Sequence, residues 1–185
     1  MKKILGAVSA IGLLAAVLIA NYVTSRYGFI PVGFGLQATA GTFAAGFALA
    51  LRDSTQDLLG KKWMLFTIFI AAAISYLIAD PFIALASAAA FLVAELVDFA
   101  IYTPLRQKAK LGDRRWAAAV IGSNIGSAFA DTIVFLAIAF GWAAVLPTLA
   151  GQMVGKLWAT AAYLIVGKVV AYRGSTQNSV VRAVG

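Results

Sequence analysis

The sequence predicts an all-α polytopic membrane protein with six transmembrane helices. Hydrophobic residues make up 62% of the 185-residue chain and charged residues only 12%, about half of the charged fraction usual in a soluble domain. The apolar runs are each about 20 residues long, the length that a helix needs to span a bilayer. They are continuous, whereas barrel strands alternate apolar and polar residues, and a helix satisfies every backbone amide within its own segment.

Charged or polar segments divide the chain into six predicted spans. The first follows Lys2 and Lys3 and resembles a signal peptide. Its apolar stretch is longer than a usual signal core and no clear cleavage site follows, so we predict a retained helix. The spans are Ile4–Thr24, Gly33–Leu51, Trp63–Ala79, Phe82–Thr103, Trp116–Trp142 and Pro147–Val170. They form one transmembrane domain over residues 1–172, and a polar cytoplasmic tail covers residues 173–185.

The basic residues are distributed asymmetrically around these spans. The net charge is +8, and almost all cations fall on one side of a six-span arrangement. That side carries Lys2, Lys3, Arg52, Lys61, Lys62, Arg106, Lys108, Lys110, Arg114, Arg115, Lys168, Arg173 and Arg182. The other side carries Arg26, and Lys156 lies within a span. Because cytoplasmic loops are enriched in Lys and Arg, this bias predicts an inner-membrane protein with both termini in the cytoplasm.

Missing residue types narrow the possible functions. The chain has no cysteine and no histidine, which excludes disulfides, thiol nucleophiles, Ser-His-Asp triads and the usual zinc sites. No P-loop motif for ATP hydrolysis occurs. We therefore predict that the protein is not an enzyme and holds no metal ion and no cofactor. Its basic residues flank membrane spans, so we expect a lipid bilayer and no nucleic acid as partner.

The fourth span carries two acids on one helix face. Glu95 and Asp98 lie three residues apart, and each ionised group at mid-span costs about 2.5–3.5 kcal/mol on insertion scales. Such residues are expected to face the protein interior and to serve function, although a polar contact between helices is the alternative. Asp98 could instead pair with Arg106 or another loop cation.

The fifth span has a similar stripe of Asn124, Ser127 and Asp131. Amide and hydroxyl groups suit a neutral polar ligand. The alternative is a packing seam of small residues, which the neighbouring Gly122 and Gly126 would favour.

The sixth span contains Gln152 and, near the midplane, Lys156. A buried ammonium needs a carboxylate, and we predict Asp131 as its partner in preference to Glu95. A purely structural ion pair is the alternative. Gln37 adds an amide in the second span. The polar stripes predict a pocket near mid-membrane, and the aromatic residues beside them suit a flat polar heterocycle.

Four segments together resemble the queuosine precursor transporter family, also called the VUT or YhhQ-like family. They are ALRDSTQDLLG (Ala50–Gly60), AELVDFAIYTPLRQ (Ala94–Gln107), SNIGSAFADTIVFLAIAFG (Ser123–Gly141) and QMVGKLW with its in-span lysine. The resemblance implies six helices, a likeness to the substrate-binding subunits of energy-coupling-factor transporters, and uptake of 7-deazaguanine bases for tRNA modification. Positions that match the family pattern are Asp53, Asp98, Arg106, Asn124, Asp131 and Lys156.

The sequence and the resemblance together predict an inner-membrane importer of 7-cyano-7-deazaguanine or a related base. The alternative is a substrate-binding subunit that works with a separate ATPase module. The partner is then a small nucleobase-like molecule, and a homo-oligomer is possible. The predicted substrate-binding residues are Gln37, Glu95, Asp98, Asn124, Ser127, Asp131, Gln152 and Lys156.

Overall fold

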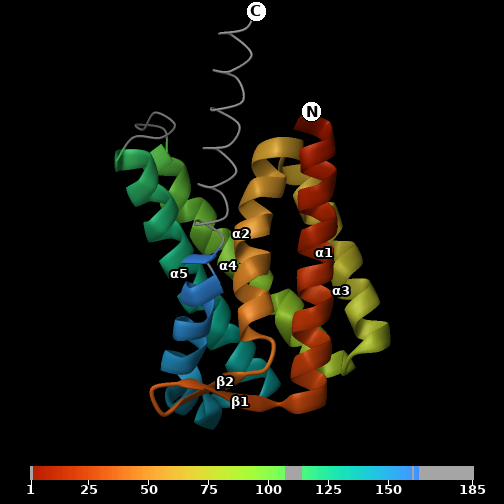
Figure 1. Ribbon diagram of the computed structural model, residues 1–185, viewed down its shortest axis with the longest axis vertical. Coiled ribbons are helices and arrows are strands. Elements are labelled where there is room, and N and C mark those ends of the chain that lie inside the picture. The colour runs from red at the N-terminus through yellow and green to blue at the C-terminus, as the bar shows by residue number, and fades with distance from the viewer. Residues whose placement is uncertain (1, 107–113, 160, 163–185) are drawn as a thin grey trace, which may run out of the picture.

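The computed structural model describes residues 2–106, 114–159 and 161–162 and consists mainly of long helices. Figure 1 shows these helices running roughly along one axis, with a β-hairpin at the end opposite the amino terminus. The elements are α1 (Lys2–Tyr27), β1 (Phe29–Gly33), β2 (Leu36–Thr39), α2 (Thr42–Leu59), α3 (Lys61–Ile78), α4 (Pro81–Arg106) and α5 (Arg114–Ala139). A further helix covers residues 142–159. The predicted all-α membrane fold is thus confirmed in its class.

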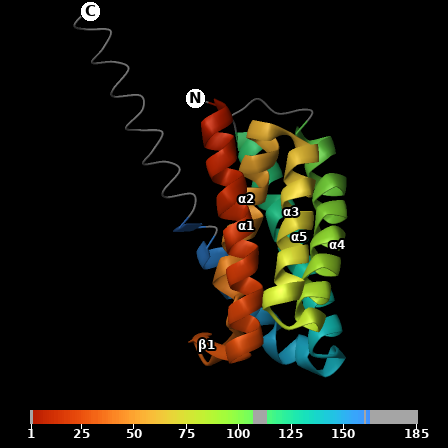
Figure 2. The same cartoon turned by 90° about the vertical axis from the view of Figure 1, so that its right-hand side faces the viewer.

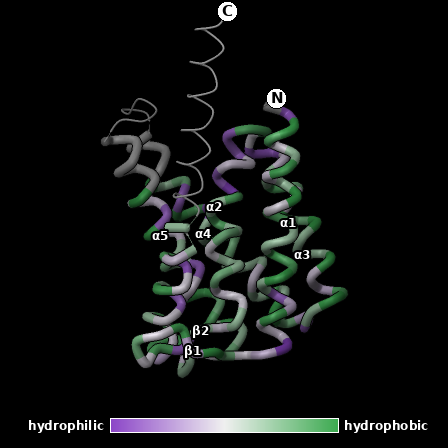
Figure 3. The backbone as a smooth tube through the Cα atoms, viewed as in Figure 1, coloured by the Kyte–Doolittle hydropathy of each residue, from purple (hydrophilic) through white to green (hydrophobic). Residues whose placement is uncertain are grey.

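Four of the helices in the described residues are long and apolar enough to cross a membrane. They are α1, α3, α4 and α5, with mean hydropathies of 2.3, 1.5, 2.0 and 1.5. Hydrophobic residues dominate the tube in Figure 3, and hydrophilic residues gather where α2 ends and α3 begins. Large apolar side chains remain exposed along the helices, for example Ile11 and Phe69. Such faces suit contact with lipid.

The predicted second span is wrong in its bounds. Residues 29–39, part of which was assigned to a helix from Gly33, form an antiparallel hairpin in which Phe29 pairs with Thr39. Its tip carries Gly33, Phe34 and Gly35, all with positive φ angles of 94°, 54° and 71°. Two glycines allow this left-handed turn at little steric cost. The hairpin is a correction to the purely helical prediction.

Helix α2 begins at Thr42 and continues to Leu59, eight residues beyond the predicted end of its span. Arg52, which was predicted to lie in a cytoplasmic loop, is therefore on a helix, and only 1% of its surface is exposed. The loop position of Arg52 was predicted from its positive charge alone. In the structure, acidic side chains surround the guanidinium group.

The ends of α4 and α5 follow local rules that the sequence contains. Asp80 accepts hydrogen bonds from the backbone amides of Phe82 and Ile83, at 2.9 and 3.0 Å, and Pro81 occupies the first helical position, where no amide hydrogen is needed. After α5 ends, Gly141 has a φ of 82° and the next helix begins one residue later. The sixth span thus starts five residues before its predicted start at Pro147.

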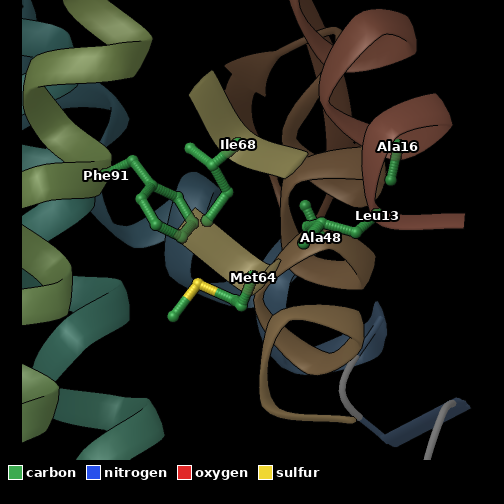
Figure 4. Packing of buried hydrophobic residues seen from close by; sticks show 6 residues of the cluster. All are labelled: Leu13, Ala16, Ala48, Met64, Ile68 and Phe91. Atoms are coloured by element: carbon green, nitrogen blue, oxygen red, sulfur yellow. The ribbon is translucent and has the colours of Figure 1, made fainter. Parts of the chain in front are cut away.

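The helices form one continuous bundle. Helices α1, α2 and α3 contact one another, α3 also contacts α4, and α4 packs along α5; Figure 2 shows α3 beside α4. A small apolar core joins α1, α2, α3 and α4, and Figure 4 shows its members. They are Leu13, Ala16, Ala48, Met64, Ile68 and Phe91. Small side chains on α1 and α2 allow those helices to approach closely.

Glycines let the helix over residues 142–159 lie directly against α2 and the hairpin. A Cβ atom at Gly151 would collide with the backbone carbonyl of Gln37, and one at Gly155 would collide with the Thr42 side chain. From the opposite side, a Cβ atom at Gly46 would lie 2.9 Å from the Cα atom of Lys156. These contacts hold Lys156 against α2.

Candidate functional site

A cavity lies at the hairpin end of the protein, between α1, α2, α4, α5 and the helix over residues 142–159. Its volume is about 50 Å³, enough for a few water molecules. Seven polar side chains contribute to its lining: Asn21, Thr24, Thr39, Ser87, Asp131, Gln152 and Lys156. Phe91 and Phe135 add aromatic surface. The cavity therefore combines flat apolar faces with hydrogen-bonding groups.

An ion pair forms one wall of the cavity. The Lys156 ammonium group donates hydrogen bonds to Asp131 Oδ2 and to Thr132 Oγ1, the latter at 2.7 Å. Only 3% of Lys156 is exposed, so the carboxylate compensates a charge that is removed from water. The predicted pairing of Lys156 with Asp131 is confirmed. The pair is electrically neutral, which favours a ligand without net charge.

Hydrogen bonds hold the other polar side chains in place. Gln152 donates from Nε2 to Thr39 Oγ1 at 2.7 Å, which ties the hairpin to the helix over residues 142–159. Asn21 donates from Nδ2 to Ser75 Oγ at 3.0 Å, and Thr24 Oγ1 accepts from the Gly41 amide at 3.0 Å. Preorganised side chains of this kind reduce the entropy lost when a ligand binds.

A second, partly buried group of charges lies further from the hairpin. Arg52 Nη2 is 2.7 Å from Asp53 and 3.3 Å from Asp98, and Arg52 Nη1 is 3.7 Å from Glu95. Lys61, at the start of α3, lies 3.3 Å from the same Glu95 carboxylate. We call these five residues the charge cluster. It connects α2 and α3 to α4.

Comparison with known families identifies the chain. Residues 77–170, about half of the sequence, match the family model named "Putative vitamin uptake transporter". The chain belongs to this family. The matched segment includes α4, α5 and the helix over residues 142–159, and therefore both members of the Lys156–Asp131 pair. No curated protein and no solved structure matches the chain significantly.

Membership in the vitamin uptake transporter family gives the protein its general role. The family is one of transporters, and the protein is a multi-pass membrane protein with apolar helices. A small-molecule substrate and a membrane setting follow. The cavity is a place where polar groups and free space meet.

The transporter brings three of the eight predicted site residues to the cavity, namely Asp131, Gln152 and Lys156. Glu95 and Asp98 belong to the charge cluster. Ser127 is buried and donates to the Asn124 carbonyl at 3.3 Å, and neither of the two lines the cavity. The Gln37 side chain is exposed on β2. The suggested pairing of Asp98 with Arg106 lies outside the described side chains.

Sequence reasoning missed the contribution of the first helix to the cavity of this transporter. Asn21 and Thr24 are both buried, with 3% exposure each, and they line the cavity together with Thr39. Polar residues near the end of an apolar span look like membrane-interface residues. The spacing of three residues between Asn21 and Thr24 places them on one helix face, and this was the available signal.

Proposed function

We propose that the protein imports a 7-deazaguanine base, with 7-cyano-7-deazaguanine as the leading candidate, for queuosine modification of tRNA. The observation that carries the proposal is the neutral, partly aromatic cavity with the Lys156–Asp131 pair in its wall. Family membership supports small-molecule uptake. The identity of the base comes from the sequence resemblance described above.

The chemistry of the base agrees with the chemistry of this cavity. A deazaguanine presents a carbonyl acceptor beside ring N–H and amino donors, and it carries no net charge near neutral pH. Asp131 uses Oδ2 for the lysine contact, and we assign Oδ1 to the donors of the base. The side-chain amide of Asn21 or Gln152 can donate a hydrogen bond to the carbonyl or nitrile group. Phe91 and Phe135 offer aromatic faces on which the base can stack.

Rescue of tRNA modification tests the substrate. In cells that can neither make nor import the base, the gene is expected to restore queuosine at nanomolar to micromolar external precursor. Asp131→Asn and Asn21→Leu are expected to abolish rescue while protein still reaches the membrane. Gln37→Ala is the matched control, because its polar side chain is exposed and lies away from the cavity, and it should rescue like the unmodified protein.

Reconstitution separates a self-contained carrier from a substrate-binding subunit. Purified protein in liposomes is expected to take up labelled base without ATP and without any other protein. Binding without uptake would instead support the subunit that needs an ATPase module. Failure of the unmodified protein to bind any deazaguanine would refute the substrate assignment.

The transporter is proposed to lie in the inner membrane with its hairpin outside the cytoplasm. The amino terminus lies at the opposite end from the hairpin (Figure 1), together with Lys3, Lys61 and Lys62. A reporter after Arg173 should therefore behave as cytoplasmic, and one near Ala144 as external. A periplasmic carboxyl terminus would contradict this orientation.

A further inference from the structure

We infer that the charge cluster is an ionic gate, which closes the path from the cavity to the face that carries the amino terminus. Its bridges run from Arg52 on α2 to Glu95 and Asp98 on α4. The inference rests on the proposal that the cavity holds substrate, and it adds the route by which substrate leaves. Opening would require α2 and α4 to separate at the cluster.

The position of the cluster relative to the cavity supports a gate. Ala48 of α2 and Phe91 of α4 line the cavity. Arg52 follows Ala48 by four residues, and Glu95 follows Phe91 by four residues. Four residues advance a helix by about 6 Å and return the side chain to nearly the same face. The bridged charges therefore lie one helical turn beyond the cavity, on the same faces of the same two helices.

The bridges of the cluster are looser than the ion pair in the cavity wall. Arg52 Nη1 and Nη2 and Glu95 Oε2 are buried and make no hydrogen bond within the described structure, and the bridging distances are 3.3 and 3.7 Å. By contrast, Lys156 donates hydrogen bonds to Asp131 and Thr132. Ion pairs without good hydrogen-bond geometry recover little of the cost of removing charges from water. Separating α2 from α4 therefore loses little stabilisation.

Arg52 also retains a partner when the bridges break. Asp53 is its neighbour on α2 and accepts a hydrogen bond from Arg52 Nε at 2.8 Å. This contact moves with α2, so the guanidinium group keeps one carboxylate in either arrangement. Such a resident partner reduces the penalty that an unpaired buried charge would impose on the open state.

Lys61 connects the cluster to solvent. Its side chain is 45% exposed, yet the ammonium group lies 3.3 Å from Glu95 and 4.7 Å from the centre of the Phe99 ring. Lys61 is the first residue of α3, at the end of the bundle opposite the hairpin (Figure 1). Water can therefore reach the cavity from this end once Arg52 and Glu95 part.

Cysteine accessibility tests the gate directly, because the natural chain contains no cysteine. Ser87→Cys places one thiol in the cavity lining, and a membrane-impermeant maleimide is added to inside-out or right-side-out vesicles. The gate is opened by the double change Glu95→Gln with Asp98→Asn, which leaves Arg52 paired with Asp53. An open minor state of a two-state protein is commonly about 0.1–10% populated, so we expect labelling from the amino-terminal face to rise by at least about tenfold.

Controls make the result decisive. Lys62→Gln removes a cation next to Lys61 that makes no salt bridge in the described structure, and it should leave labelling unchanged. Arg52→Gln, a second way to break the bridges, should raise labelling like the double change. Unchanged labelling in both gate variants, with folded protein and normal binding of the base, would refute the gate and leave the proposed function standing. Raised labelling in a protein that binds no deazaguanine would support the gate and refute the substrate.

Discussion

Replacing Lys156 by methionine is expected to lower both the folded yield and the uptake of substrate severely. The change leaves Asp131 as a partly buried carboxylate without its ammonium partner. Removing one member of a buried ion pair costs about 3–5 kcal/mol. Yield and melting temperature of the purified protein in detergent measure the loss of stability, and uptake into cells measures the loss of function.

The double change Lys156→Met with Asp131→Asn separates the structural role from the binding role of the pair. An apolar and an amide side chain need no mutual compensation, so folded yield should recover well above that of Lys156→Met alone. Uptake should remain absent, because the Asp131 carboxylate, which is proposed to accept hydrogen bonds from the base, has been removed. Recovery of uptake in the double variant would show that the pair serves structure alone.

Substituting alanine for Gly151 is expected to destabilise the protein, although alanine is the better helix former by about 1 kcal/mol. The added methyl group meets the backbone carbonyl of Gln37, which cannot move without shifting β2. Overpacking of this kind costs about 1–3 kcal/mol. A displaced hairpin also withdraws Thr39 from Gln152, so melting temperature and uptake should both fall.

Gly122→Ala is the matched control for this substitution. Gly122 lies within α5, and a Cβ atom there would have no neighbour within 4 Å. This change should leave stability equal or slightly higher, since only helix propensity changes. A drop in stability of the same size in both variants would contradict the close contact between Gly151 and the hairpin.

The membrane helices were predictable from the sequence because their apolar runs match the thickness of a bilayer. The hairpin was not, because Phe29–Thr39 is rich in apolar residues and hydropathy alone does not separate a short apolar strand from a helix. Gly28, Gly33, Gly35 and Gly41 were the available warning. A window that weighs glycine as a turn residue would have started the second span after Gly41.

The sequence predicted the ion pair of the site, but it did not predict most of the other residues that surround it. A lysine inside a span requires an acid, and this reasoning identified Asp131 correctly as the partner of Lys156. Helical rise gives the depth of Glu95 but does not say which helices are neighbours. Arg52 resembled a loop cation from its charge, so its bridges to α4 could not be foreseen. Only the three-dimensional arrangement of the bundle decides that the long Arg52 side chain reaches Glu95 on α4.

The small cavity has a kinetic consequence for the transporter. Its free volume of about 50 Å³ is well below the 300–1,000 Å³ or so that ligand pockets usually offer. The proposed substrate, a bicyclic base, can enter only after the surrounding helices move apart. Association that waits for such a movement is slower than diffusional encounter, so the rate of capture should approach a ceiling as the concentration of the base rises. That ceiling would equal the opening rate of the helices around Asn21 and Phe91.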